Sequence, residues 1–468
     1  DNYNSLDGGG SGIWTSNYQD EWSTYSVYIY FYHCEFINNF SPNNGGGYGI
    51  GYEERIKPNR LSFYQCEFTG NHCEGSDGGG ALWIRTSSSC SIIECTFKDN
   101  YASESVASNG GAVYISFTTN MIYMTISQCT FVNNSCPHFN SKGHAVYSTL
   151  LYGRIEITYT NMTDNGIGCD YSNSVVYTRS EIRVYNSLIT NTNKENVYSR
   201  AIYVGASSDL TMRNNLVANC SVVSEGGAAI YYESIKNKGS SSVDIIDNTF
   251  INNTGDGRGT EIYLYVFNSP RLYNCTFIDE NATQEIILVR YENVLSYSTV
   301  YDRFDFINCN FNNYHFISII PDDDKVMDEK SLHMTSCRFI SCSNIHFFFS
   351  NYYSFEITNC YFEDNINNDS FFTIDTVTTN ALIKDCEFKN NRLKNTENSE
   401  LAFIKVTRVL LTIINTKFEN EDIDCKQNDQ LKSSIIHTDC QLNLTNVSFT
   451  NCSSFNCSIN FRQMLCSI

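Results

Sequence analysis

Residues 95–134 read CTFKDNYASESVASNGGAVYISFTTNMIYMTISQCTFVNN and contain one full repeat of this chain. The motif Cys-x-Phe-x-x-Asn stands at both ends, at 95–100 and 129–134. Between them lie a Gly-Gly-Ala turn with an apolar strand at 110–115 and an alternating strand at 121–126. None of these segments has the period of a helix. The stretch therefore predicts one turn of a solenoid built from two or three short strands.

The motif recurs along the chain. Other full copies begin at Cys34, Cys66, Cys360 and Cys386. Degenerate copies centre on Met162, Leu188, Leu216, Phe250, Phe277, Phe311, Phe339, Phe418 and Phe449. Together they give fifteen positions, 23 to 34 residues apart. A repeat of about 29 residues cannot bury its own apolar face, but stacked repeats can.

These repeats predict an all-β fold, a right-handed single-stranded parallel β-helix of about fifteen coils. β-Propellers have repeats of about 40–50 residues, and leucine-rich repeats need a different consensus. With rungs about 4.8 Å apart, the coils would form a rod of roughly 70 Å. We expect a single continuous β-helix over 1–468, with an incomplete first coil or cap at 1–30, regular coils at 31–424, and Cys-rich coils and a cap at 425–468.

The motif residues are expected to form columns along the stack. Cys and Phe share a strand face because residues i and i+2 point the same way, so both lie inside. The Asn that closes each motif tolerates the left-handed backbone and predicts a side-chain amide ladder. We expect other residues in the middle of the Cys column at Thr160, Asn186, Asn214 and Asn248, and Cys again at Cys275, Cys309 and Cys337. The clearest ladder positions are Cys34, Cys66, Cys95, Cys129, Phe36, Phe68, Phe97, Phe131, Asn39, Asn71, Asn100 and Asn134.

The chain has 20 Cys but no CxxC pair and no HExxH motif, which favours an oxidising, secreted setting over zinc binding. Cys residues inside the column are either buried thiols or disulfides between coils, although in-register parallel neighbours have poor disulfide geometry. Cys outside the column, and the C-terminal cluster that could staple a cap, are the better disulfide candidates. They are Cys73, Cys90, Cys136, Cys169, Cys220, Cys425, Cys440, Cys452, Cys457 and Cys466.

Charge and hydropathy exclude two classes of partner. The net charge of −20 argues against nucleic acid, whose phosphates need basic clusters. The longest apolar runs, such as 345–349, fall far short of the ~20 residues of a membrane-spanning helix. We therefore expect no nucleic-acid partner, no membrane-spanning segment in this chain, and an extracellular or cell-surface location.

Twelve Asn-x-Ser/Thr sites occur, close to the roughly ten or eleven that chance predicts for this composition. Sites in or next to the turn after the motif Phe, such as Asn39, Asn133 and Asn252, are expected to carry glycans if they face outward. The candidates are Asn39, Asn133, Asn161, Asn219, Asn252, Asn274, Asn281, Asn368, Asn443, Asn446, Asn451 and Asn456.

Catalysis on this fold would need a cluster of carboxylates on one outer face. Two short segments resemble sequence elements of polygalacturonases, which are enzymes with this fold. They are Arg55-Ile56-Lys57 and Gly143-His144-Ala145. Their order along the chain is wrong for such an enzyme, and the set of elements is incomplete. The densest acidic run, Asp322-Asp323-Asp324, predicts a solvated loop, with weak Ca²⁺ binding as the alternative. We expect no other cofactor and no catalytic residue; a polysaccharide lyase or hydrolase is the alternative function.

The pairing of Gly-Gly-Ala, as at 79–81 and 110–112, with Phe-x-x-Asn, as at 97–100 and 131–134, resembles the repeats of chlamydial polymorphic membrane proteins and their protist relatives. The likeness covers nearly the whole chain, although the glycines disappear after about residue 260. It implies a secreted β-helix that serves adhesion. The bacterial members end in an outer-membrane barrel with no counterpart in this sequence, so the resemblance favours a eukaryotic, protist member.

These features predict a non-catalytic structural or adhesive rod that is secreted or held at the cell surface. One version is a glycosylated subunit of an extracellular filament or coat. The partners expected are other copies of the chain or surface glycans and proteins.

Overall fold

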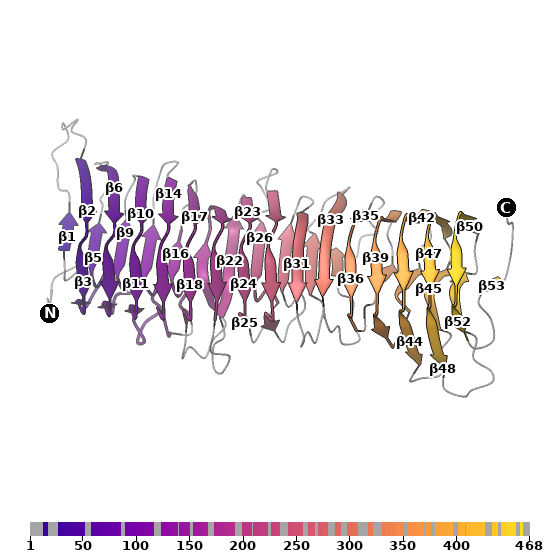
Figure 1. Ribbon diagram of the computed structural model, residues 1–468. Helices are drawn as coiled ribbons and strands as arrows, with labels where there is room; N and C mark the ends of the chain where they lie inside the picture. Colours follow the sequence, from indigo (N-terminus) through magenta and orange to yellow (C-terminus); the bar gives the residue numbers. More distant parts are fainter. Residues whose placement is uncertain are drawn as a thin grey trace. The chain divides into compact units, whose positions relative to one another are not determined.

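The computed structural model describes short strands and turns separated by segments that are left out of the description. The described residues are 13–16, 27–51, 58–85, 89–116, 123–138, 140–149, 153–166, 173–191, 199–207, 209–222, 226–234, 242–255, 261–266, 270–278, 286–291, 297–307, 317–321, 330–343, 345, 347–350, 354–368, 370–375, 380–395, 401–407, 409–425, 433–438, 441–454 and 459–461. All regular elements among them are β-strands, and the strand pairings described are parallel (Figure 1). The predicted all-β parallel β-helix is confirmed.

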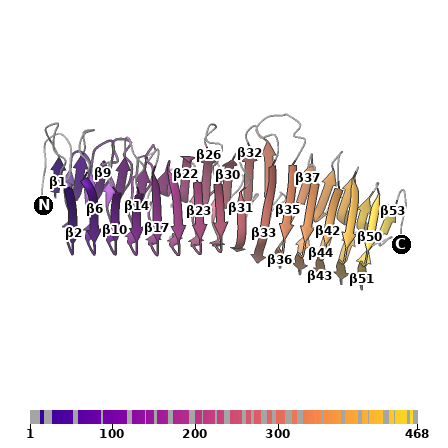
Figure 2. The ribbon, with the colours of Figure 1, turned by 90° about the horizontal axis from the view of Figure 1, so that it is seen from above.

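The chain divides into two compact units. The first comprises residues 1–242, 253–257 and 261–264, and the second comprises residues 243–252, 258–260 and 265–468. Each is a stack of turns in which a leading strand, a motif strand, a short strand and a glycine-side strand follow one another (Figures 1 and 2). The prediction of one continuous domain stays a prediction.

In the first unit each class of strand pairs with its own kind. The motif strands are β3 (Glu35–Ile37), β7 (Glu67–Thr69), β11 (Thr96–Lys98), β15 (Thr130–Val132), β18 (Asn161–Thr163), β21 (Leu188–Thr190) and β24 (Leu216–Ala218). The leading strands are β2 (Val27–Tyr32), β6 (Pro58–Tyr64), β10 (Ser89–Ile93), β14 (Tyr123–Ser127), β17 (Arg154–Thr158), β20 (Glu181–Tyr185) and β23 (Asp209–Arg213). The glycine-side strands are β1 (Ile13–Ser16), β5 (Tyr48–Gly51), β9 (Leu82–Arg85), β13 (Val113–Ser116), β16 (Val146–Ser148), β19 (Asn173–Thr178), β22 (Ser199–Ser207), β26 (Ile230–Ser234) and the start of β30 (Ile262–Val266). The short strands are β4 (Phe40–Ser41), β8 (His72–Cys73), β12 (Tyr101–Ala102), β25 (Ser221–Val222) and β29 (Thr254–Gly255).

The second unit repeats this order, except that β31 (Arg271–Ile278) and β33 (Tyr297–Ile307) each span the leading and motif positions without a break. Its other leading and motif strands are β27 (Ser242–Ile246), β28 (Thr249–Ile251), β35 (Lys330–Thr335), β36 (Arg338–Ile340), β38 (Ser354–Thr358), β39 (Tyr361–Glu363), β42 (Asn380–Lys384), β43 (Glu387–Lys389), β46 (Leu410–Ile414), β47 (Lys417–Glu419), β50 (Leu442–Thr445) and β51 (Ser448–Thr450). The glycine side and the short side hold β32 (Ile287–Tyr291), β34 (Ile317–Pro321), β37 (Phe347–Ser350), β40 (Ile366–Asn367), β41 (Phe372–Asp375), β44 (Arg392–Asn395), β45 (Leu401–Thr407), β48 (Asp422–Cys425), β49 (Ser433–Thr438), β52 (Ser453–Ser454) and β53 (Ile459–Phe461).

The number of complete turns differs from the sequence prediction. About nine turns have described strands on every side, fewer than the fifteen coils expected. The lower number arises on the side of the short strands, because the chain often passes through a bend there without forming a strand. Tyr101 and Ser135, for example, form only an isolated bridge. The motif alone therefore overestimates how many turns are complete.

Two residues with left-handed backbone bracket most described motif strands. Around β11 they are Glu94 at φ 53° and Asp99 at φ 54°. The second of these precedes the ladder Asn, here Asn100. The prediction that the ladder Asn itself takes this conformation is therefore wrong at these turns, since the bend comes one residue earlier. Asn and Asp are frequent there because their side chains tolerate positive φ.

The predicted Phe column is confirmed. Ring centroids of successive Phe are 4.7 Å apart for Phe36 and Phe68, 4.8 Å for Phe68 and Phe97, and 4.6 Å for Phe97 and Phe131. The rings lie nearly parallel because the strands pair in register. Cys66, Cys95 and Cys129 are buried beside them, as predicted, and Cys34 is half-buried.

Two degenerate copies of the motif in the first unit were assigned to the wrong residue. Met162 pairs with Ile189, not Leu188, and Ile189 pairs with Val217, not Leu216, which is 37% exposed. The same slip moves the Cys column from Asn186 and Asn214 to Ser187 and Asn215, which are buried. A shift of one residue reverses which face a strand side chain occupies.

In the second unit the backbone of Phe306 pairs with Phe277 and Phe339, so Phe306 and not Phe311 holds the column position. Phe304 pairs with Cys275 at the position predicted for Cys309. Phe311 and Cys309 lie outside the described residues.

The sequence prediction missed an aromatic stack on the glycine side of the first unit. Trp83 and Tyr114 lie in one buried cluster, and the stack continues with centroid spacings of 5.2, 5.2, 4.8, 4.6 and 4.8 Å. A signal was present, because an aromatic residue lies four positions after Gly79, Gly110, Gly143 and Gly227. We call these seven residues the aromatic stack: Trp83, Tyr114, Tyr147, Tyr177, Tyr203, Tyr231 and Tyr263.

Truncating a ring of the Phe column should destabilise the first unit strongly. Phe97→Ala removes a fully buried ring with a stacked neighbour on each side, and we expect it to lower the free energy of unfolding by about 3–5 kcal/mol. Urea unfolding followed by circular dichroism measures the change. Lys98→Ala, at the exposed neighbouring position, is the control. Equal midpoints for the two variants would contradict the assigned core.

Candidate functional site

The predicted Asn ladder is confirmed in the first unit. Asn39, Asn71 and Asn100 are buried, and the side-chain nitrogen of each donates to the side-chain oxygen of the next ladder Asn at 2.9, 2.9 and 3.0 Å. The backbone N–H of each donates to the same oxygen at 3.0–3.1 Å. The ladder runs on through Asn134 to Asn165. These amides join the turns and are not free for chemistry.

A buried acid takes the place of Asn in the second unit. Asn365 donates to Asn391 at 2.8 Å, and Asn391 donates to Oε1 of Glu421 at 3.1 Å. Glu421 is fully buried, and its Oε2 has no partner among the described residues. Burial raises the pKa of this carboxyl from 4.5 to about 8. The neutral acid is therefore the favoured form inside the stack at neutral pH.

Cys replaces Asn at other ladder positions. The backbone N–H of Cys220 donates to the side-chain oxygen of Asn253 at 2.9 Å, and that of Cys342 donates likewise to Asn365 at 2.9 Å. Cys452 occupies the corresponding place after Phe449, where its thiol contacts the Phe418 carbonyl. A small buried thiol fits the space of the amide but cannot extend the ladder.

Several disulfide candidates lie on strands rather than in turns. Cys90, on β10, pairs with Leu61 and Met124, and Cys73, on β8, pairs with Ala102. Cys73, Cys90, Cys220 and Cys452 are free thiols in the structure. Burial raises the pKa of the Cys73 thiol to about 12 and also raises those of Cys90 and Cys220. These interior positions make the thiols poor nucleophiles.

Cys73 and Cys136 share a buried cluster with Ala102, which lies in the turn between them. Two rungs, roughly 9.6 Å, exceed the Cα separation of a disulfide, so this pair is excluded. Cys425 ends β48 and its side chain is not described. Cys169, Cys440, Cys457 and Cys466 lie outside the described residues. Their pairing stays a prediction.

The polygalacturonase-like elements do not come together within the described residues. His144 is fully buried, and its Nδ1 lies 3.4 Å from Sγ of Cys136. Burial lowers the pKa of His144 to about 3, so the imidazole is neutral. The chain segments 55–57 and 322–324 lie outside the described residues. Gly143-His144-Ala145 is thus an interior packing feature of its turn.

A group of exposed aromatic residues lies on β2, which Figure 1 labels in the first unit. Tyr28, Tyr30 and Tyr32 alternate along this strand on its outer face and are 56%, 47% and 59% exposed. The rings of Tyr28 and Tyr30 are 6.4 Å apart and tilted by only 2°, and Tyr32 follows at 6.3 Å and 29°. Arg60 on β6 pairs with Tyr28. We call Tyr28, Tyr30 and Tyr32 the tyrosine row.

A row of exposed rings is costly in water and is typical of surfaces that bind a partner. Tyrosine suits such contacts because each ring offers an apolar face and a hydroxyl for hydrogen bonding. The sequence prediction missed this row, although alternation at 28, 30 and 32 was its signal. The row could stack against flat, partly apolar ligands such as sugar rings.

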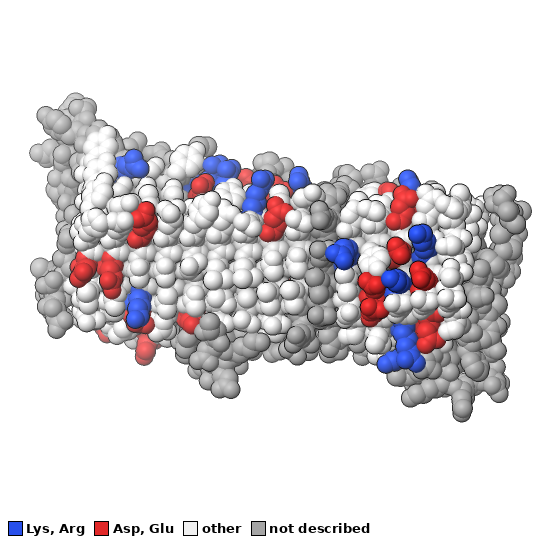
Figure 3. Space-filling view, in the orientation of Figure 1, with Lys and Arg blue, Asp and Glu red and all other residues white. Residues whose placement is uncertain are grey.

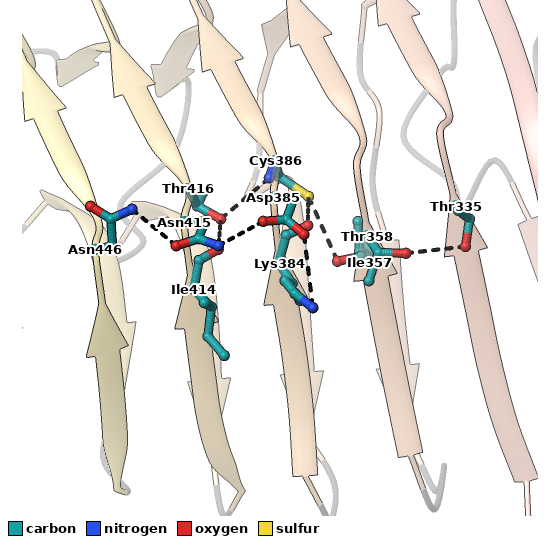
Figure 4. Close-up of polar contacts among 10 residues, drawn as sticks. All are labelled: Thr335, Ile357, Thr358, Lys384, Asp385, Cys386, Ile414, Asn415, Thr416 and Asn446. Carbon is teal, nitrogen blue, oxygen red and sulfur yellow. Dashed lines mark hydrogen bonds and ion pairs between the residues drawn. The ribbon is translucent and has the colours of Figure 1, made fainter.

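The outer faces of the units differ in charge. The face of the second unit shown in Figure 3 carries interspersed acidic and basic side chains, whereas the first unit's face has a broad uncharged area. One ion pair of the second unit joins Glu363 and Lys389 at 3.4 Å. Exposed Asn and Asp side chains also form ladders. Asn446 donates to Asn415, and Asn415 donates to Asp385, both at 2.9 Å (Figure 4). These contacts hold neighbouring turns together at the surface.

The glycosylation candidates fall into four groups. Asn39 is buried and part of the ladder, so the folded chain does not present it. Asn281 and Asn456 lie outside the described residues, and Asn219, Asn252, Asn274 and Asn443 are half-buried. The exposed candidates are Asn133, Asn161, Asn368, Asn446 and Asn451.

Comparison with protein-family models and with curated proteins finds no match to this chain. The likeness to polymorphic membrane proteins therefore stays a resemblance of short motifs. In the described parts of the chain, no helix is long and apolar enough to cross a membrane. Nor do three or more His, Cys, Asp or Glu side chains group there as metal ligands would. Calcium binding at 322–324 remains untested.

Glu421 should make the second unit less stable as pH rises. Its folded pKa is raised, so its contribution is fully present below 4.5 and is lost as pH rises through about 8. Glu421→Gln keeps the shape but cannot ionise. We expect its thermal midpoint to match the parent at pH 4 and to exceed it at pH 8. Glu419→Gln, on the outer side of β47, should behave like the parent at both pH values. A Glu421→Gln variant no more stable at pH 8 would refute the buried-acid assignment.

Asn161 should be modified and Asn39 should not when the chain is secreted by eukaryotic cells. Asn161 is exposed at the start of β18, whereas the amide of Asn39 is hydrogen-bonded inside the stack. Mass spectrometry of glycopeptides from the folded, secreted protein measures occupancy, and Asn161→Gln controls for assignment. Full occupancy at Asn39 would contradict its buried position.

Proposed function

We propose that this chain is a non-catalytic β-helix scaffold, secreted or held at the cell surface, that adheres to surface glycans or proteins. The observation that carries the proposal is the tyrosine row, three exposed and successively stacked rings on one strand. Tyrosine is among the residues that contribute most to binding when it lies on an exposed face.

The use of polar side chains also supports a scaffold. The side chains of the buried ladder Asn residues form hydrogen bonds to neighbouring turns, as that of Asn71 does to Asn100. Cys136 and His144, whose side chains lie 3.4 Å apart, are both buried. Chemistry for recognition is thus concentrated on outer faces. Self-association into a filament or coat belongs to the same proposal, with other copies of the chain as the partner.

Tyr30→Ala should weaken adhesion by about tenfold, because the middle ring of the row would be lost and hot-spot aromatic residues contribute at least that much. Screening against an array of neutral oligosaccharides, and separately against intact cells, would identify a ligand. Calorimetry with the oligosaccharide that binds best would give its affinity. The matched control is Tyr123→Ala, which removes a ring that is 53% exposed on β14.

Unchanged binding in Tyr30→Ala would remove the tyrosine row from the adhesive surface. Binding to no cell, glycan or second copy of the chain would overturn the proposed function. Release of reducing sugars from a polyuronide would establish the enzymatic alternative instead.

A further inference from the structure

Two cations meet at one hydroxyl of the aromatic stack. Nζ of Lys142 lies 3.4 Å from the phenol oxygen of Tyr177, and Nε of Arg179 lies 3.3 Å from the same oxygen. Lys142 also lies 4.7 Å from the centre of the Tyr177 ring. Tyr177 lies on β19, and Arg179 follows directly after the end of that strand. Lys142 lies shortly before β16, which belongs to the preceding turn. Separate turns thus bring two positive charges together.

No carboxylate among the described residues lies within ion-pair distance of Lys142 or Arg179. This is unexpected in a chain with 51 acidic and 31 basic residues. Elsewhere in the same unit the basic side chains of Arg154 and Arg183 share Glu181 at 2.6 and 2.9 Å. The neutral phenol oxygen does not offset the repulsion between the two cations. An arriving anion would.

Another cation lies further along the aromatic stack. The guanidinium of Arg200 lies 5.0 Å from the ring centre of Tyr231 and 5.8 Å from that of Tyr203. Glu233, an acid beside the stack, accepts a hydrogen bond from the Tyr203 hydroxyl at 3.4 Å. Asp77 belongs to the turn of Trp83 and contacts Asn44. Neither acid pairs with the two cations at Tyr177.

We propose that Lys142, Arg179 and the Tyr177 hydroxyl form a site for the anionic substituent, a sulfate or a carboxylate, of an acidic glycan. The proposal deepens the adhesive function above and rests on it. A guanidinium donates in a planar fork that suits both groups, and the ammonium adds a compact charge. The Tyr177 O–H remains a donor, since its oxygen only accepts from the two cations.

Binding to heparin, polygalacturonate and dextran tests the site, because these polymers carry sulfate, carboxylate and no charge. We expect the full chain to bind one or both acidic polymers and not dextran. Lys142→Gln/Arg179→Gln should weaken that binding at least tenfold, since each lost charged hydrogen bond is worth about a factor of ten. Lys142→Arg/Arg179→Lys, which keeps the charges, should retain most of it. The polymer that binds identifies the anionic group.

The matched control is Lys98→Gln/Arg213→Gln, which removes the same charge from exposed positions on β11 and β23. It should bind within about twofold of the parent. Equal weakening of both double variants would mean non-specific attraction and would overturn the site. So would acidic polymers that bind no better than dextran, or poly-glutamate that competes better than acidic oligosaccharides, since the ligand would then be a protein.

This failure can be distinguished from failure of the proposed function. If binding to neutral glycans or cells persists and depends on Tyr30, while acidic polymers do not bind, only the anion site is wrong. If neither activity is found, the adhesive function itself is wrong. Circular dichroism of each variant confirms that loss of binding is not loss of folding.

Discussion

Along the described strands, a buried side chain generally meets its equivalent from the next turn, because the strands pair in parallel and largely in register. A residue at a buried column must therefore be compatible with copies of itself about 4.8 Å away. Phe satisfies this by stacking, as Phe68 does on Phe97, and Asn does so because its amide both donates and accepts. A charge cannot, since it would face the same charge. The self-compatibility of side chains is the constraint on which the rest of each unit depends.

The exceptions follow the same rule. Glu421 interrupts a column of amides, and the burial that the column imposes keeps it protonated well above the usual range for a carboxylic acid. Cys takes Asn positions at Cys220 and Cys342 because a small thiol fits, although it cannot pass on a side-chain hydrogen bond. At the surface, where water is present, unlike charges can alternate from turn to turn, as Glu363 and Lys389 do. The sign and size of each side chain are thus selected by its neighbour one turn away.

This rule also explains what the sequence could reveal. The Phe and Asn columns were predictable because Phe97 and Asn100 recur at fixed offsets, and repetition is visible in one sequence. Leu188 and Leu216 were misplaced because each is followed by another apolar residue, so the pattern did not say which one faces inward. The tyrosine row and the aromatic stack were missed because Tyr is polar enough to be taken as surface and apolar enough to be taken as core. The site at Tyr177 could be found only from the structure, because Lys142 and Arg179 are widely separated in the sequence.

Recognition of a ligand requires something that repetition alone does not supply. A perfectly regular stack presents the same group at every turn, so it binds every position equally and selects no length or pattern. The columns change at Tyr28 and Tyr30, where the next strand has Arg60 and Ser62 at the paired positions, whereas Tyr32 pairs with Tyr64. They change again at Arg179, two residues after Tyr177 of the aromatic stack. The equivalent positions in the neighbouring turns hold Thr149 and Gly205. Such breaks leave the buried ladders intact, because they lie on outer positions. The regular interior thus allows the outer face to vary turn by turn, and specificity can reside in a few substituted turns.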